Sequence, residues 1–275
     1  MNKKILSTLL TIFISTSIYA NSTIKTNTKP LTQNEVGNIS TSIQPLTQDQ
    51  IGQMATEYFM KHPEKMLRII KNIQTSMQQA QTNEVKQTLI QNKDFLLKSS
   101  YLPVMGSKDA KNTLIFFYDF QCVYCHKMYP HLVQLLKDDP NTKIIFVPLH
   151  VFGKASKYAN EMGLYLNSIG KFTAFYDALE KGNLIEGKLT DKEVDQVVEK
   201  LGVNLKGAKQ YINSKGIQQA LSKIDRLQQA LRIQGTPFMF ILPSNESEIT
   251  LNNIKIIGGY VGIDQLKAEI SSSEK

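Results

Sequence analysis

Two cysteines separated by only two residues carry the most distinctive chemistry in this sequence. Cys122 and Cys125 are the only cysteines among 275 residues, and His126 follows them directly. Three kinds of site use this spacing: a redox-active dithiol, half of a zinc site, and a point of covalent haem attachment. The rest of the sequence therefore has to distinguish these three chemistries.

The zinc and haem hypotheses explain less of the sequence than the dithiol does. A zinc site needs two more ligands, and without a second cysteine pair the nearest candidates are His126 and His131. All four ligands would then crowd into residues 122–131. A haem would account for His126 but not for the apolar stretch before the pair, nor for Thr236-Pro237 far downstream. We therefore expect no metal and no other cofactor, and keep a c-type haem protein as a minor alternative.

The residues around the cysteines predict how they would work as a dithiol. Residues 114–118 form a nearly continuous apolar run, typical of a buried central strand, and Cys122 follows at the turn into a helix. Free backbone N–H groups and the positive end of the helix dipole would favour the Cys122 thiolate, which is the nucleophilic form. Cys125, one turn further along, would be more buried, less reactive, and able to resolve a mixed disulfide.

The order of the predicted elements indicates the fold class. After the first strand and the CxxC helix, the apolar patterns predict a strand at 143–148, helices over roughly 156–231, strands at 238–242 and 254–257, and a helix at 263–270. This is the order of an α/β thioredoxin-like fold with a helical insertion. We therefore predict a thioredoxin-like catalytic domain over 99–275, with the insertion at about 153–231.

Three motifs resemble those of the thioredoxin-fold thiol–disulfide oxidoreductases of the bacterial periplasm. They are DxxCxYCHK at Asp119–Lys127, GTP at Gly235–Pro237 and GGY at Gly258–Tyr260, and they are most similar to the DsbC/DsbG isomerase group. The resemblance covers about residues 101–272. It implies that Thr236-Pro237 is a cis peptide bond that faces the dithiol, where Thr236 pairs with an extended substrate segment.

The resemblance also implies roles for individual residues of this region. Cys122 and Cys125 would be the catalytic pair and would form the redox disulfide. The side chains that would tune this pair or contact substrate are Val123, Tyr124, His126, Asp119, Thr236 and Pro237.

Several of these residues favour disulfide isomerisation over oxidation. Tyr124 stands where DsbC-like proteins carry Tyr and DsbA-like oxidases carry His, and Thr236 also matches the isomerases. Phe116 occupies the position of the buried acid of oxidases and thioredoxins, whereas the isomerase group has its acid at the Asp119 position. Val123 departs from the family, which more often has Gly or Pro there. We expect an isomerase that can also form disulfides, with a DsbA-type oxidase as the alternative and a redox-independent chaperone as a minor one.

The first part of the chain predicts export. Residues 1–20 have a basic start, a short apolar core and a final Ala20, which is the layout of a cleaved secretory signal, so we expect a periplasmic protein. Residues 21–45 are rich in Asn, Thr and Ser and are expected to form a flexible linker. The near-repeat of PLTQNEVG at Pro30–Gly37 and PLTQDQIG at Pro45–Gly52 has no assigned role.

Residues 46–98 predict amphipathic helices that pair with a second copy of the chain. One helix is expected from Thr47 and another from Pro63, and the second carries a heptad-like apolar seam that restarts out of phase near Val85. The segment YFMKHPEKM at Tyr58–Met66 resembles a dimeric DsbA-like subgroup of bacterial envelope proteins. We therefore expect a homodimer formed through residues 47–98.

The expected partners follow from these assignments. They are unfolded or misfolded exported proteins with cysteines, and a membrane redox partner, either a DsbD-like reductant for an isomerase or a DsbB-like oxidant for an oxidase. The net charge of +8 comes from basic residues scattered among acidic ones. This pattern favours a solvated basic surface, and we expect no nucleic-acid binding.

Overall fold

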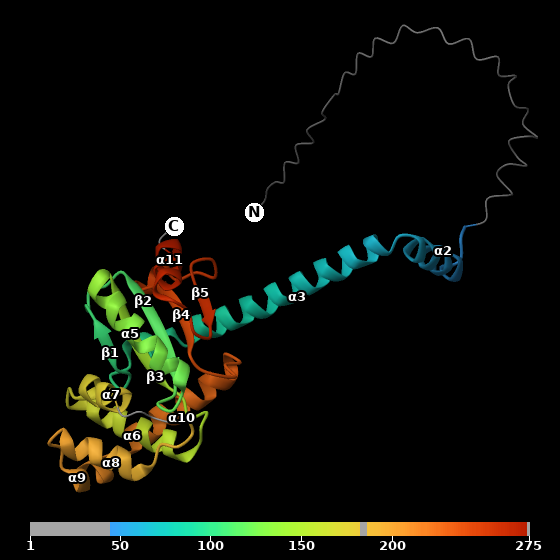
Figure 1. Ribbon diagram of the computed structural model, residues 1–275. Coiled ribbons are helices and arrows are strands. Elements are labelled where there is room, and N and C mark those ends of the chain that lie inside the picture. The colour runs from blue at the N-terminus through green and yellow to red at the C-terminus, as the bar shows by residue number, and fades with distance from the viewer. Residues whose placement is uncertain (1–44, 182–185, 274–275) are drawn as a thin grey trace, which may run out of the picture. The chain divides into compact units, whose positions relative to one another are not determined.

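The computed structural model describes residues 45–181 and 186–273 (Figure 1). The predicted signal peptide, all but the last residue of the predicted linker, and the first copy of the near-repeat lie outside these residues. The chain divides into two compact units, residues 1–67 and 68–275. Within the described ranges, no helix combines the length and the apolar character that crossing a membrane requires.

A five-stranded mixed sheet forms the centre of the second unit. Its strands, in the spatial order β1-β3-β2-β4-β5, are β1 (Val104–Gly106), β2 (Asn112–Tyr118), β3 (Thr142–Pro148), β4 (Phe238–Pro243) and β5 (Lys255–Gly258). β2 and β3 run parallel, whereas the other neighbouring strands are antiparallel. Every residue of β2 is buried, because this strand lies in the middle of the sheet and is covered on both faces.

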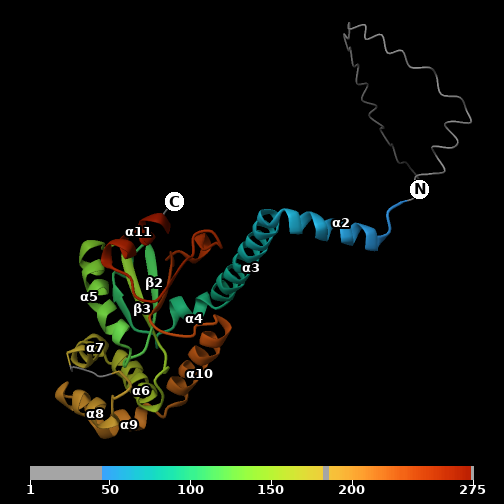
Figure 2. The same ribbon diagram turned by 45° about the vertical axis from the view of Figure 1, so that its right-hand side comes forward.

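Successive side chains of β2 point to opposite faces of the sheet, and each face has its own hydrophobic core. Phe116 packs in a core that includes α5 (Val123–Asp138) and α11 (Ile263–Ser273). Phe117 packs in a second core that includes α10 (Lys215–Ala230). Figure 2 shows α5 and α10 on opposite sides of the strands. The sheet therefore lies between two packed layers, and α5, which follows β2, belongs to one of them.

Helices fill the chain between β3 and β4. Besides α10 they are α6 (Lys154–Ser168), α7 (Phe172–Glu180), α8 (Asp191–Lys200) and α9 (Leu205–Tyr211). Figure 1 shows α6 to α9 gathered at one end of the sheet. The order of elements confirms the predicted thioredoxin-like fold with a helical insertion.

Within the described residues, three helices precede β1 in the sequence. α2 (Gln48–Lys61) starts after Thr47 with a capping box, and α3 (Pro63–Gln91) has the proline in its first turn. They are followed by α4 (Lys93–Lys98), which is too short to leave a clear periodic pattern. α3 continues without a break across the point where the apolar seam changes phase, because neither Gly nor Pro interrupts it.

The phase change in α3 reflects two different surroundings along one helix. Ile70 and Ile73, before the change, are exposed in the single chain. Leu89, after the change, is buried in the core that also contains Phe117. Since the first stretch is exposed and the second packs in the core, their apolar residues need not lie on one continuous stripe.

Candidate redox site

Cys122 occupies the N-cap of α5, shortly after β2 ends at Tyr118. The backbone N–H groups of Cys125 and His126 donate to the Cys122 carbonyl at 2.9 and 3.1 Å, which begins the helix. The Cys122 sulfur lies 3.2 Å from the carbonyl oxygen of Thr236, to which its thiol donates a hydrogen bond. The fold thus brings the start of α5 against the segment that leads into β4.

The surroundings of Cys122 hold the pKa of its thiol far below the usual value, at about 6. The largest cause is the hydrogen bond from the Cys125 side chain, and it outweighs burial, which favours the neutral thiol. The Thr236 side chain and the backbone N–H groups of Cys125 and Tyr124 lower this pKa further. The buried Thr236 hydroxyl makes no hydrogen bond elsewhere in the described residues, so it can turn toward a thiolate. These contacts therefore favour the thiolate of Cys122 at neutral pH, and its formation gives up the hydrogen bond from the thiol to the Thr236 carbonyl oxygen.

Cys125 has the opposite character. Both cysteines are in the reduced form and both are buried, Cys125 completely and Cys122 with 2% of its surface exposed, so the contrast lies in their electrostatic surroundings. Burial is the main cause that raises the pKa of Cys125 well above its usual value, and the neighbouring Cys122 raises it further. The two cysteines therefore differ sharply in reactivity: one is a ready nucleophile, and the other remains a protonated thiol.

The Thr236-Pro237 peptide bond is cis, and it lies beside Cys122. A surface pocket opens at this segment, and its lining residues are Arg232, Gln234, Gly235, Thr236, Pro237, Phe238 and Gly259. The backbone of this segment is therefore accessible next to the nucleophilic sulfur, where an extended chain could bind.

The remaining residues of the motif lie around the start of α5. Tyr124 is 52% exposed, and the ammonium group of Lys127 lies 5.2 Å from the centre of its ring. Val123 is half-buried. His126 is mostly buried, with one ring nitrogen 2.8 Å from the carbonyl oxygen of Phe120. In the described parts of the chain, no three His, Cys, Asp or Glu side chains gather closely enough to hold a metal ion.

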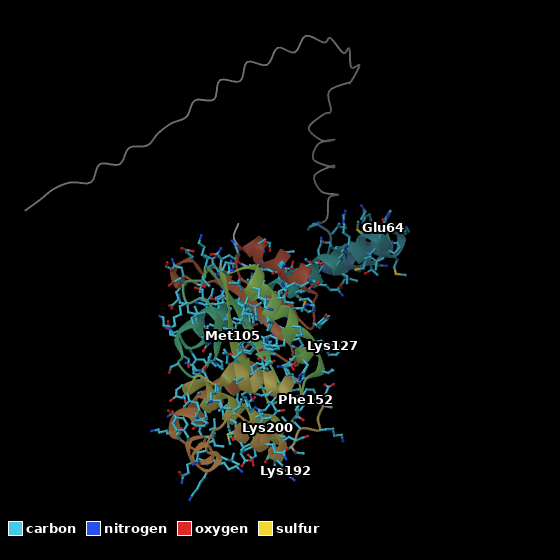
Figure 3. All side chains as sticks on the ribbon, turned by 60° about the vertical axis from the view of Figure 1, so that its left-hand side comes forward. Glu64, Met105, Lys127, Phe152, Lys192 and Lys200 are labelled. Carbon is cyan, nitrogen blue, oxygen red and sulfur yellow. The ribbon has the colours of Figure 1, made fainter. Side chains whose placement is uncertain are left out.

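The buried carboxylate of Asp119 ties the loop before Cys122 to the helical insertion. Its Oδ1 accepts hydrogen bonds from the Gln121 backbone N–H at 2.8 Å and the Ser156 hydroxyl at 2.7 Å, and its Oδ2 accepts one from the Phe152 N–H at 3.1 Å. Figure 3 labels Phe152, which lies between β3 and α6. The Gln121 side chain in turn donates to the Ser156 hydroxyl and accepts from the Leu189 N–H. Asp119 is therefore a structural anchor of the active-site loop.

Comparison with known proteins identifies the family of this dithiol domain. A family model described as the DSBA-like thioredoxin domain matches residues 113–271, which is more than half of the chain. The chain belongs to this family. The match includes both cysteines and the Thr236-Pro237 segment, so the chain is a thiol–disulfide oxidoreductase of the DsbA-like family.

Individual relatives agree with this assignment. The probable disulfide bond formation protein D of Bacillus cereus is 27% identical over 147 residues, or 50% of this chain and 68% of that protein. Among solved structures, BcfH of Salmonella enterica Typhimurium has a TM-score of 0.69 at 25% identity and covers 89% of this chain and 100% of its own. ScsC of Proteus mirabilis in a compact conformation has a TM-score of 0.57 at 22% identity, covering 82% of this chain and 98% of its own, a likeness of fold alone.

In this DsbA-like domain, three residues around the dithiol were not predicted from the sequence. Gln121 and Ser156 complete the hydrogen-bond network of Asp119, and Glu180 contacts His126. Gln121 directly precedes Cys122, and this position is the only feature of the sequence that could have indicated its role in the site. Ser156 and Glu180 belong to the insertion and carry no local signal, because only the folded chain brings them to the dithiol.

Replacing Asp119 with asparagine should destabilise the domain by about 2 kcal/mol or more. The carboxylate oxygens accept only, and the Asn amide would direct its own N–H groups at one of the donors from Gln121, Ser156 and Phe152. Urea unfolding of the reduced protein would measure this loss. Asp109→Asn, at an exposed position, is the matched control and should change the free energy of unfolding by less than about 0.5 kcal/mol. Equal stability of the two variants would contradict the anchoring role of Asp119.

Proposed function

We propose that this chain is a periplasmic thiol–disulfide interchange enzyme that isomerises disulfides in exported proteins. The observation that supports this proposal best is the contrast between Cys122, whose pKa is about 6, and the buried Cys125, whose pKa lies well above its usual value. A thiolate attacks disulfides, whereas a protonated thiol resolves the resulting mixed disulfide slowly. A slow resolving cysteine leaves time for a substrate thiol to complete the rearrangement.

The proposed reaction begins when the Cys122 thiolate attacks one sulfur of a non-native disulfide. The new bond between Cys122 and the substrate forms as the substrate disulfide breaks, and the second substrate sulfur leaves as a thiolate. Another substrate thiolate then attacks the substrate sulfur of the mixed disulfide, forms the new pairing and returns Cys122 as a thiolate. No net oxidation occurs in this cycle. If Cys125 attacks instead, substrate leaves reduced, and the Cys122–Cys125 disulfide must be reset by a DsbD-like membrane reductant.

The motif residues agree with isomerisation. Tyr124 is exposed beside Cys122, where a substrate can reach it, and the carbonyl oxygen of Thr236, a residue that resembles the one in the DsbC/DsbG group, lies 3.2 Å from the Cys122 sulfur. Phe116 is fully buried in the core, at the position where oxidases carry an acid. The Asp119 carboxylate is occupied by three donors and anchors the loop.

The alternative function is that of a DsbA-type oxidase that works with a DsbB-like membrane oxidant. A low pKa of the nucleophilic cysteine stabilises the reduced form, and this makes the corresponding disulfide a stronger oxidant. The value of about 6 for Cys122 is therefore compatible with disulfide formation as well. The membership in the DSBA-like family supports the same alternative.

The activity test that separates these functions starts from scrambled, fully oxidised ribonuclease. The mature protein with a trace of reductant is expected to restore ribonuclease activity at a rate close to that of a known disulfide isomerase. A parallel assay starts from reduced ribonuclease and measures disulfide formation. No recovery from scrambled ribonuclease, together with rapid oxidation of reduced ribonuclease, would overturn the isomerase proposal in favour of the oxidase.

The proposed enzyme acts as a homodimer formed through residues 47–98. The apolar side chains that α2 and α3 leave exposed include Ile51, Met54, Tyr58, Met60, Met66, Leu67, Ile69, Ile70, Ile73 and Met77. Exposed apolar side chains in such number mark an interaction surface. A dimer would present two dithiols to one misfolded substrate, which suits isomerisation.

Light scattering of the mature chain should therefore give twice the mass of one chain. Changing both Ile70 and Ile73 to glutamine should yield a monomer, because both side chains are exposed on α3 in the single chain and glutamine preserves the helix. Lys71→Gln, on the same helix, is the control and should leave the mass unchanged. A wild-type chain that is monomeric at micromolar concentration would refute the dimer.

A further inference from the structure

Both ring nitrogens of His126 face hydrogen-bond acceptors. Nε2 lies 2.8 Å from the carbonyl oxygen of Phe120, and Nδ1 lies 2.8 Å from Oε2 of Glu180. A neutral imidazole carries one N–H group, whereas the imidazolium carries two. The carbonyl oxygen and the carboxylate both accept hydrogen bonds. The doubly protonated ring is therefore the form that satisfies both contacts.

The pair between His126 and Glu180 is sheltered from water. The two side chains are 17% and 14% exposed, so the solvent screens their attraction much less than it screens a surface ion pair. Burial by itself would lower the pKa of His126, but the hydrogen bond and charge of Glu180 overcome this effect and raise it. The other titratable group that acts on the ring is Cys122, and the nearby Tyr129 and Tyr176 respond to Glu180.

The His126 ring acts on Cys122 because the two residues lie one helical turn apart. Residues separated by four positions share a face of a helix, and the His126 backbone N–H donates to the Cys122 carbonyl at 3.1 Å. A negative charge on Cys122 raises the pKa of His126. Since such coupling is reciprocal, a positive charge on His126 stabilises the Cys122 thiolate.

We propose that Glu180, at the C-terminal end of α7 in the helical insertion, is a positioning residue that holds His126 as an imidazolium beside Cys122. The insertion thereby sets how readily the nucleophilic cysteine ionises. Sequence alone connects Glu180 with neither cysteine, and its role is separate from substrate binding at the Thr236-Pro237 segment. The inference rests on the proposed role of Cys122 as the nucleophile.

The first test follows the protonation of His126 directly by NMR in the full mature chain. In the wild-type protein, its ring should titrate above the usual range for histidine, and further above it in the reduced than in the oxidised protein. Glu180→Gln should lower this pKa by about one unit or more, because the neutral amide no longer attracts the cation. Asp177→Asn is the matched control on the same helix, where the carboxylate contacts Tyr129 instead, and it should leave the titration in place. An unchanged His126 titration in Glu180→Gln would overturn the proposal.

The second test measures the ionisation of Cys122 from the thiolate absorbance at 240 nm. His126→Gln should raise the pKa of Cys122, because the cation is gone. With His126 present, Glu180→Gln should also raise the pKa of Cys122. In a chain that already carries His126→Gln, the same change should not raise the pKa of Cys122, because removing an anion can then only favour the thiolate. A lower Cys122 pKa in Glu180→Gln with His126 present would mean that the carboxylate acts directly on the sulfur, and would refute the positioning role.

These readouts distinguish this inference from the proposed function. The NMR titration reports the protonation of His126 and needs no turnover. Its result therefore stands even if the enzyme proves to be an oxidase. Circular dichroism would establish that each variant retains its fold. If Glu180→Gln does not fold, the His126→Gln variant still tests whether the charge of His126 lowers the pKa of Cys122. An unchanged pKa of Cys122 in that variant would contradict the proposal.

Discussion

Replacing Cys122 with serine is expected to reduce both isomerisation and oxidation to the uncatalysed rate. The Cys122 thiol, with a pKa of about 6, is the group that attacks substrate disulfides, and a serine hydroxyl does not ionise at neutral pH. Cys125 cannot replace it, because its pKa is raised well above the usual value and it therefore stays a protonated thiol at neutral pH. Recovery of activity from scrambled ribonuclease would measure the loss. Residual catalysis above background by Cys122→Ser would show that the nucleophile lies elsewhere.

The matched variant, Cys125→Ser, should behave differently from Cys122→Ser. It retains the nucleophile but removes the thiol that resolves the mixed disulfide, so covalent complexes with substrate should accumulate. Non-reducing electrophoresis and mass spectrometry would detect these complexes, which a reductant should release. Because serine also carries a hydrogen-bond donor at this position, Cys122 should still ionise and attack substrate in this variant. Absence of any trapped complex would contradict the resolving role of Cys125.

The parts of the fold that the sequence predicted are those determined by local patterns. The continuous apolar run of β2 predicted a buried central strand, and the motif placed Cys122 at the start of a helix. Both predictions depend on residues adjacent in the chain. β1, with only three residues, and α4, with six, were too short to produce a periodic signal.

The parts of the site that could not be predicted depend on contacts between distant segments. Asp119 was expected to tune the dithiol, but its role as the anchor of the loop emerged only when Ser156 and Phe152 were seen to donate to it. In the same way, His126 was placed near the thiolate by the motif, whereas its ion pair with Glu180 depends on the packing of α7 near α5. A hydroxyl, a backbone N–H and a carboxylate in an insertion have no distinctive sequence pattern.

The contribution of Cys122 to the stability of the reduced protein should grow as the pH rises from 6 to about 9, whereas the contribution of His126, whose pKa is raised, should fall over part of this range. The pKa of this thiol is about 6 in the folded protein and 9.0 when it is unperturbed, as in the unfolded chain. Between these values this thiol binds more protons in the unfolded state than in the folded state, so its contribution to the free energy of unfolding increases with pH. The contribution is lost as the pH falls through 6 and is complete above 9. Cys125, whose pKa is raised, adds no pH dependence below its unperturbed value of 9.0.

The three-unit difference between 6 and 9.0 corresponds to at most about 4 kcal/mol. Guanidinium unfolding in the presence of a phosphine reductant would measure it at pH 5.5, 7 and 8.5. Cys122→Ser provides the reference, since it retains every other titrating group. The stability difference between wild type and variant should grow across this series. A constant difference would mean that the folded protein does not favour the Cys122 thiolate, and the nucleophile would then lack the charge on which the proposed exchange depends.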